Sequence, residues 1–210
     1  ILTHIGHSGK VLVMRVFIAV LVLIFSLQSW TKADDIREIE IEEMSVGDNA
    51  LDFFSKDVLD ENTDFYPNSK KFFRTTIALD NNEFGSVQMH IKNENNEYII
   101  YAIAGIIYYQ KNDPKKKCND KRSEIVNDIS AILTNAKKSE IETDLEPGDE
   151  TGKSYGEAIY FDFKDDYSEY VKVGCVFYGE EFYKKSKWLN HLRLSLTSSE
   201  FHYWLKDEAN

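Results

Sequence analysis

Residues 98–110, YIIYAIAGIIYYQ, constrain the fold of this chain more than any other stretch. The segment carries no charge and is rich in β-branched and aromatic side chains, which favour strands. It is too short to cross a bilayer as a helix. Both faces of an extended chain would be apolar here, which predicts a central strand that is covered on both sides. Gly105 within it predicts a bulge or a close approach of another part of the chain.

The residue pattern on either side of this segment predicts further strands and helices. Expected strands are residues 71–79, 86–92, 155–164, 169–178 and 188–196. Expected helices are a short one at 44–54 capped by Ser45, a second after Ser55, a long one at 119–137, and a terminal one opening with a Thr197–Glu200 capping box.

Three polar segments are expected to lie outside this framework. We expect an exposed strand or an extended lead-in at residues 34–43. We expect a mobile acidic loop at 139–154 and a charged loop at 179–187. The chain is therefore predicted to be α+β, with antiparallel sheet in the order αα-βββ-α-βββ-α and helices packed against the sheet.

The N-terminal region has the pattern of a secretory signal peptide. Met14 and Arg15 precede an apolar run at 16–27, and Thr31 and Ala33 suit the positions before a cut. We expect a signal peptide at 14–33, upstream residues at 1–13, and one exported domain at 34–210, periplasmic or secreted. An uncleaved anchor is the alternative to cleavage, and half-units 34–111 and 112–210 are the alternative to one domain.

The acidic balance of the chain limits its partners. The formal net charge is −11, and such a surface repels phosphate backbones, which disfavours binding to nucleic acid. It also disfavours binding to anionic membranes, so the only membrane contact we expect is through the signal peptide before cleavage.

The two cysteines, Cys118 and Cys175, both lie in the segment expected to be exported. An even number of cysteines outside the cytosol predicts a disulfide. Cys118 shares a helical face with Ile125 and Ile129, and Cys175 shares a strand face with Val173. We expect the two residues to be bonded to each other, with buried free thiols or an intermolecular bridge as alternatives.

No catalytic, cofactor-binding or metal-binding residues are predicted. The histidines after residue 33 are His90, His191 and His202, and the first two occupy positions expected to face outward on strands, where His90 would be solvated. No nucleophile, zinc or phosphate-loop motif is present. A catalytic pair of carboxylates remains an alternative in so acidic a chain, because the sequence does not show which acids lie close together in a cleft.

Tyrosine is the other notable feature of the chain. These residues predict either a recognition surface or ordinary half-buried strand positions. The tyrosines concerned are Tyr108, Tyr109, Tyr155, Tyr160, Tyr167, Tyr170, Tyr178 and Tyr183.

The stretch IEIEEMSVGDNALDFFS, residues 39–55, resembles the IEGMSIGDSLLDYFS-like segment of a group of uncharacterised small exported proteins of marine bacteria. The likeness continues to the F-x-x-W-L motif at 201–205, and departs at Glu43, where that group has Gly. The resemblance implies export and a shared fold.

Met44-Ser45 and the element order are also similar to β-barrel assembly accessory lipoproteins and β-lactamase inhibitor proteins, although the lipobox cysteine is absent. By analogy this implies a binding role. We therefore expect a non-enzymatic domain of the bacterial envelope that binds a protein or envelope component through one sheet face and the acidic loop. The alternative is an envelope hydrolase that uses paired carboxylates.

Overall fold

The computed structural model describes residues 33, 35–80, 82–94, 97–110, 114–146 and 148–209. Residues 33–210 form one compact unit. Apart from Ala33, the predicted signal peptide and residues 1–13 lie outside the described residues. Within the described ranges, no helix is both long and apolar enough to span a membrane.

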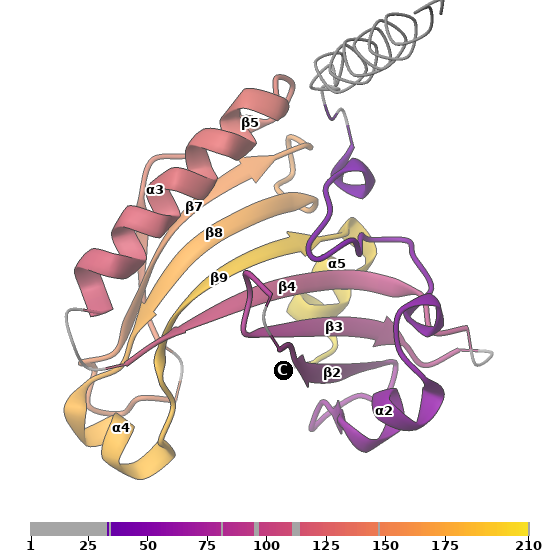
Figure 1. Ribbon diagram of the computed structural model, residues 1–210, viewed down its shortest axis with the longest axis horizontal. Helices are drawn as coiled ribbons and strands as arrows, with labels where there is room; N and C mark the ends of the chain where they lie inside the picture. The colour runs from indigo at the N-terminus through magenta and orange to yellow at the C-terminus, as the bar shows by residue number, and fades with distance from the viewer. Residues whose placement is uncertain are drawn as a thin grey trace, which may run out of the picture. The chain divides into compact units, whose positions relative to one another are not determined.

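The described strands form one twisted antiparallel sheet (Figure 1). Its order is β1-β2-β3-β4-β9-β8-β7-β5, and β6 also pairs with β7. The strands are β1 (Thr63–Phe65), β2 (Phe72–Ala78), β3 (Ser86–Lys92), β4 (Ile100–Tyr109), β5 (Lys137–Lys138), β6 (Glu142–Leu145), β7 (Tyr155–Asp162), β8 (Tyr170–Phe177) and β9 (Asn190–Thr197).

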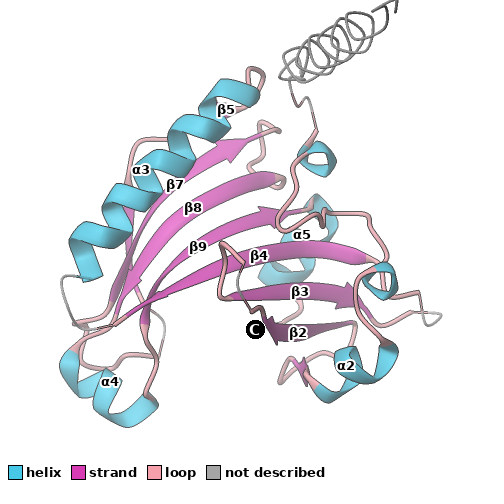
Figure 2. Ribbon diagram, viewed as in Figure 1, coloured by secondary structure: helices cyan, strands magenta, loops and turns pink. Residues whose placement is uncertain are grey.

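Helices lie on both sides of this sheet (Figure 2). They are the 3₁₀ turns η1 (Ile36–Glu38) and η2 (Ala50–Asp52), and the α-helices α2 (Lys56–Glu61), α3 (Pro114–Ile132), α4 (Glu180–Ser186) and α5 (Ser199–Asp207). Helix α3 packs on one face, called the α3 face here, and α5 packs on the other, called the α5 face (Figure 1). The predicted α+β class with helices against antiparallel sheet is confirmed.

Strand β4 occupies the centre of the sheet, as its sequence predicts. It pairs with β3 on one edge and β9 on the other, and most of its residues are buried. Gly105 is the predicted close approach: a Cβ there would lie 2.5 Å from Cδ1 of the Phe84 ring. The irregularity in pairing falls elsewhere, between His90 and Ile91 of β3.

The α3 face is covered over its central strands, whereas the edge strands β5 and β6 are exposed. Apolar residues of the N-terminal segment and of α3 join one hydrophobic cluster with the inward side chains of β3, β4, β8 and β9. The covering residues include Ile36, Ile39, Ile41, Met44, Leu59, Ile125, Val126 and Ile129. The expectation of an exposed lead-in at 34–43 is therefore wrong, because its isoleucines are needed to cover the sheet.

Helix α5 covers part of the opposite face. Phe201 and Trp204 are buried against Phe72 of β2 and Ala102 of β4, with the rings of Phe72 and Trp204 4.7 Å apart. The predicted docking of this helix is confirmed. Its cap is Ser198, which accepts from the Phe201 N–H, rather than the predicted Thr197, which belongs to β9.

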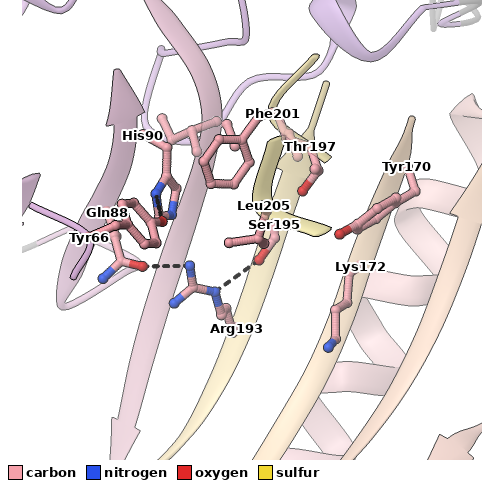
Figure 3. A pocket seen from close by; sticks show the side chains of 13 residues that line it. Tyr66, Gln88, His90, Tyr170, Lys172, Arg193, Ser195, Thr197, Phe201 and Leu205 are labelled. Carbon is pink, nitrogen blue, oxygen red and sulfur yellow. Dashed lines mark hydrogen bonds between the residues drawn. The ribbon is translucent and has the colours of Figure 1, made fainter. Parts of the chain in front are cut away.

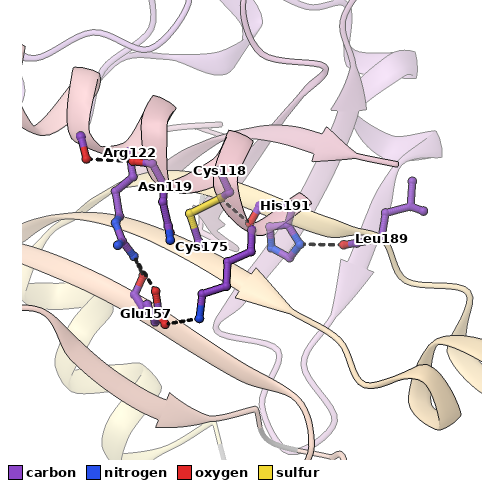
Figure 4. The surroundings of a disulfide bond; sticks show 9 residues. Cys118, Asn119, Arg122, Glu157, Cys175, Leu189 and His191 are labelled. Atoms are coloured by element: carbon purple, nitrogen blue, oxygen red, sulfur yellow. Dashed lines mark hydrogen bonds and ion pairs between the residues drawn. A yellow bond between two sulfur atoms is a disulfide. The ribbon is translucent and has the colours of Figure 1, made fainter. Parts of the chain in front are cut away.

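The predicted disulfide between Cys118 and Cys175 is present (Figure 4). It joins α3 to β8, and both residues are fully buried. Beside it the buried Arg122 donates to the backbone oxygen of Glu157 at 2.9 Å, and its guanidinium lies 3.5 Å from the Glu157 carboxylate. These contacts hold α3 against β7 and β8.

Several segments differ from the sequence-based expectation. The long helix expected at 119–137 spans Pro114–Ile132, and Lys137–Lys138 form the short strand β5. Residues 44–54 contain only the short η2 turn capped by Asn49, because backbone groups of residues 47–50 hydrogen-bond to those of Tyr98 and Ile100. Within 139–154, residues 142–145 form β6 rather than loop. Residues 180–186 form α4, whose first turn is acidic and last turn basic, an arrangement that the helix dipole favours.

Removal of the disulfide should destabilise the protein. The bond closes a loop of 57 residues, and a double Cys118→Ala, Cys175→Ala variant should lose about 4 kcal/mol of unfolding free energy on the chain-entropy estimate. Urea denaturation of the variant, the oxidised protein and the reduced protein measures this loss. The variant and the reduced protein should agree; equal stability of all three would contradict the expectation.

Substitution of Gly105 should also destabilise the fold. Gly105→Ala places a methyl group into the Phe84 ring, which should cost about 1–3 kcal/mol through overpacking. Gly156→Ala is the matched control on β7, where the nearest atom to a new Cβ is the Cys175 backbone oxygen at an ordinary 3.7 Å. Thermal unfolding compares the two, and Phe84→Leu should partly rescue Gly105→Ala but not improve the control.

Candidate functional site

A hollow of about 230 Å³ lies on the α5 face beside α5 (Figure 3). Side chains from β3, β8, β9 and α5 line it, so the order of strands in the sheet brings them together. The polar lining residues are Tyr66, Gln88, His90, Tyr170, Lys172, Arg193, Ser195 and Thr197. The hollow therefore combines hydrogen-bonding groups with positive charge.

Arg193 is the central side chain of this hollow. Its Nη2 donates to Oε1 of Gln88 at 2.6 Å, and its Nε donates to Oγ of Ser195 at 3.0 Å. These two bonds come from different strands and fix the orientation of the half-buried guanidinium. Burial lowers the pKa of Arg193.

Lys172 of β8 supplies a second positive charge on the same face (Figure 3). Its ammonium lies 5.2 Å from the ring centre of Tyr160. In the part of the chain that the structure describes, neither Lys172 nor Arg193 forms an ion pair, whereas Arg74 pairs with Asp64 at the adjacent edge. The charges of Lys172 and Arg193 also act on Glu146: burial raises the pKa of Glu146, and the two cations lower it by less.

Aromatic side chains flank these cations on both sides. Tyr160, Tyr170 and His202 form one group, with the rings of Tyr160 and Tyr170 5.6 Å apart. Tyr178 and His191 belong to a second group near α4, with ring centres 6.0 Å apart. Burial raises the pKa of Tyr160 to about 12, so its hydroxyl remains a hydrogen-bond donor.

The tyrosines noted in the sequence are mostly half-buried, and only some of them share one face of the sheet. Four of them share the α5 face: Tyr108, Tyr160, Tyr170 and Tyr178. In the strand pairing, Tyr108 lies opposite His191, Tyr160 opposite Lys172 and Tyr170 opposite Thr197. The Tyr178 ring contacts that of His191. Tyr155 instead lies over Phe177 of the α3 face, with ring centres 5.3 Å apart. Alternation along the strands thus divides the tyrosines between the two faces.

His90 is not solvated, contrary to the expectation from sequence. It is 7% exposed and its ring lies 4.4 Å from that of Phe201, because α5 covers the outward side of β3. Its Nδ1 is 2.7 Å from the Tyr66 hydroxyl. Burial, with the nearby positive charges of Arg193 and Arg74, holds the pKa of His90 well below its usual range.

A second hollow on the α5 face contains two acids. Glu142 and Asp162 line it with Tyr160, Tyr167, Tyr170 and His202, and its volume is about 440 Å³. Burial and the Glu142 charge raise the pKa of Asp162. Among the described residues, no group of three or more His, Cys, Asp or Glu side chains is placed to hold a metal ion.

The acidic segment 139–154 borders this second hollow. β6 pairs with β7 and places Glu142 opposite Ala158. The following turn is closed by Asp149, which accepts from the backbone N–H and hydroxyl of Ser154. These bonds hold the pKa of Asp149 at about 2. Asp149 therefore organises the turn instead of facing a ligand.

The sequence gives little indication of the cationic hollow. Its alternation places Arg193 and Lys172 on the outward side of two predicted strands, but it does not show that β3 and β9 flank β4. The pairing of Arg193 with Gln88, residues far apart in the chain, therefore emerges only from the structure.

Comparison with known proteins gives no match: no family model, no curated protein and no solved structure is similar to this chain. The resemblances noted in the sequence thus stay predictions.

Burial of neutral His90 predicts a pH dependence of stability. The ordinary histidine pKa is 6.5 and that of folded His90 is well below it, so between these values the unfolded chain binds the extra proton. Stability from His90 should be complete above pH 6.5 and fall by up to about 1.4 kcal/mol per pH unit below it.

Urea titrations between pH 7.5 and 5 measure this dependence. His90→Gln should show a shallower loss of stability on acidification than the unmodified protein. His202→Gln, the same change at a half-buried position of α5, is the matched control. Parallel pH curves for His90→Gln and the unmodified protein would contradict the assignment.

Proposed function

We propose that this protein is a non-enzymatic binding domain of the bacterial envelope that holds a partner protein on its α5 face. The observation that carries the proposal is the open region of that face, where Tyr66 and Tyr170 line a hollow with Arg193 and Lys172, two cations that form no ion pair among the described residues. Tyrosine and arginine are enriched at protein interfaces. The acidic segment with β6 borders the same region and would form its rim.

The chemistry of the face supports recognition rather than turnover. Its fixed guanidinium and its hydroxyls can orient a ligand, while His90, the histidine within the cationic hollow, is buried and hydrogen-bonded to Tyr66. The α3 face, by contrast, is already covered by α3 and the N-terminal segment. A partner would therefore meet the α5 face.

Export is part of the same proposal. The buried disulfide is compatible with an oxidising compartment. The signal-peptide pattern at 14–33 supports a periplasmic or secreted protein, and mass spectrometry of the native N-terminus tests cleavage before Asp34.

Site-specific crosslinking should identify the binding face. A photoreactive phenylalanine at Val176, which is half-buried on the α5 face of β8, should crosslink one stoichiometric partner in cells. The same residue at Lys116, an exposed position of α3, should not. Equal crosslinking at both positions, or none at either, would contradict the proposal; a crosslinked second copy of this chain would make the face a dimer interface.

A hydrolase is the alternative, and the hollow with Glu142 and Asp162 favours it. An acid of raised pKa beside a second carboxylate is the arrangement that a general acid and its partner need. Turnover of an envelope polysaccharide that is abolished by Asp162→Asn, but not by Asp165→Asn in the adjacent turn, would establish this activity and overturn the non-enzymatic assignment.

A further inference from the structure

We propose that the Arg193 hollow binds a carboxylate group presented by the partner. This inference rests on the proposed function for its partner, but the site itself is defined by the hollow on the α5 face. It assigns a specific chemistry to one position of that face. The free carboxylate of a small molecule would occupy it in the same manner.

The first argument is the unusual state of Arg193. A half-buried guanidinium is costly unless a counter-charge lies beside it. The chain has 36 acidic residues against 25 Lys and Arg, and several of its other basic side chains are in ion pairs. Within the described ranges, Arg193 has only the neutral partners Gln88 and Ser195. The counter-charge is thus left to a ligand.

The second argument is the geometry of the remaining donors. A guanidinium has five N–H groups, and the bonds to Gln88 and Ser195 use one on Nη2 and the one on Nε. The Nη1 group and the other Nη2 hydrogen are left. These hydrogens remain as donors for the oxygens of a carboxylate, the anion with which a planar guanidinium pairs well.

The third argument concerns charge, and it favours a single negative charge. Lys172 strengthens the positive potential of the hollow, as does Arg74, although Asp64 largely neutralises the latter. The charge of Glu146 interacts with those of Lys172 and Arg193. Glu142 and Asp162 line the neighbouring hollow. These acids would oppose a phosphate dianion more than a carboxylate.

The fourth argument is the apolar lining around the Arg193 guanidinium. The aromatic rings of Tyr66, Tyr170 and Phe201 and the side chain of Leu205 line the same hollow. Such a lining suits a carboxylate attached to an apolar or aromatic group rather than a small hydrated ion. Benzoate therefore provides a simple probe with both features.

The test is an NMR titration of the full exported domain with benzoate, and with benzamide as the neutral isostere. We expect saturable shifts of the Arg193 Nε–H and of the amides of Gln88, Lys172 and Ser195. Because hydrogen bonds to a charged group are roughly twice as strong as neutral ones, benzamide should bind at least about 10-fold more weakly. Equal affinities, or no saturable shift with benzoate, would overturn the carboxylate assignment.

Variants test whether Arg193 is the group that binds benzoate. Arg193→Gln should abolish benzoate binding, and Arg193→Lys, which keeps the charge without the planar guanidinium, should weaken it. Arg37→Gln, at an arginine paired with Asp35 on the N-terminal segment, should leave it unchanged. Unchanged melting curves show that the variants are folded. Retained binding in Arg193→Gln would overturn the inference, as would tighter binding of inorganic phosphate that displaces benzoate.

The crosslinking position Val176 separates this inference from the proposed function. Loss of the crosslinked partner in Arg193→Gln but not in Arg37→Gln supports both. If the partner is still captured in Arg193→Gln, the binding function stands and the carboxylate contact is wrong. If benzoate binds at Arg193 while no partner is captured, the site is that of a small carboxylate and the protein-binding function is wrong.

Discussion

Strand β4 has apolar side chains on both faces and hydrogen-bonds along both edges. The rest of the molecule is arranged so that both faces are buried and both edges are paired. Its edges require β3 on one side and β9 on the other. Its faces require two separate covers, which are provided by the N-terminal segment with α3 on one side and by α5 on the other. Gly105 shows how close the covering is, since the Phe84 ring occupies the position where a side chain would begin.

The two covers are unequal, and the candidate site arises from this difference. The α3 face is covered over the central strands, and the disulfide bonds α3 to β8 beneath it. Helix α5 is short and covers mainly β2, β3 and β4 of the other face. The hydrogen-bonded Arg193 and its aromatic surroundings lie where this shorter cover ends (Figure 3). A surface of fixed polar groups beside a well-packed core is a suitable platform for recognition.

The sequence predicts the parts of this structure that depend on local periodicity. The central strand, the meander before it, the long helix and the disulfide all follow from residue spacing, because apolar alternation and helical stripes report directly on burial. His90 shows the limit of such patterns. Alternation correctly places His90 on the face of β3 that Met89 and Ile91 do not occupy. It does not show that α5, which is distant in the sequence, covers that face. Helix α4 and β6 were missed because both are short and polar, so neither has an apolar stripe.

The site required still more tertiary information. Arg193 looks like any charged residue on the outer side of a strand, and its environment depends on Gln88, which reaches it across β4. Nothing near either residue in the chain indicates this pairing. The net charge of −11 does not indicate the site either, because it sums the whole chain and not the hollow, where Arg193 and Lys172 form no ion pair with any described residue.

The position of β9 has a consequence for how the chain acquires its structure. β4 is formed by residues 100–109, but its second edge waits for residues 190–197. A polypeptide that emerges from its N-terminus therefore carries an apolar strand with one row of free backbone groups until residues 190–197 are available. Such an edge is a template for association with other chains, and its late closure makes folding depend on a contact of long sequence separation. Translation and, for an exported chain, translocation must proceed past β9 before this protein can bury its central strand.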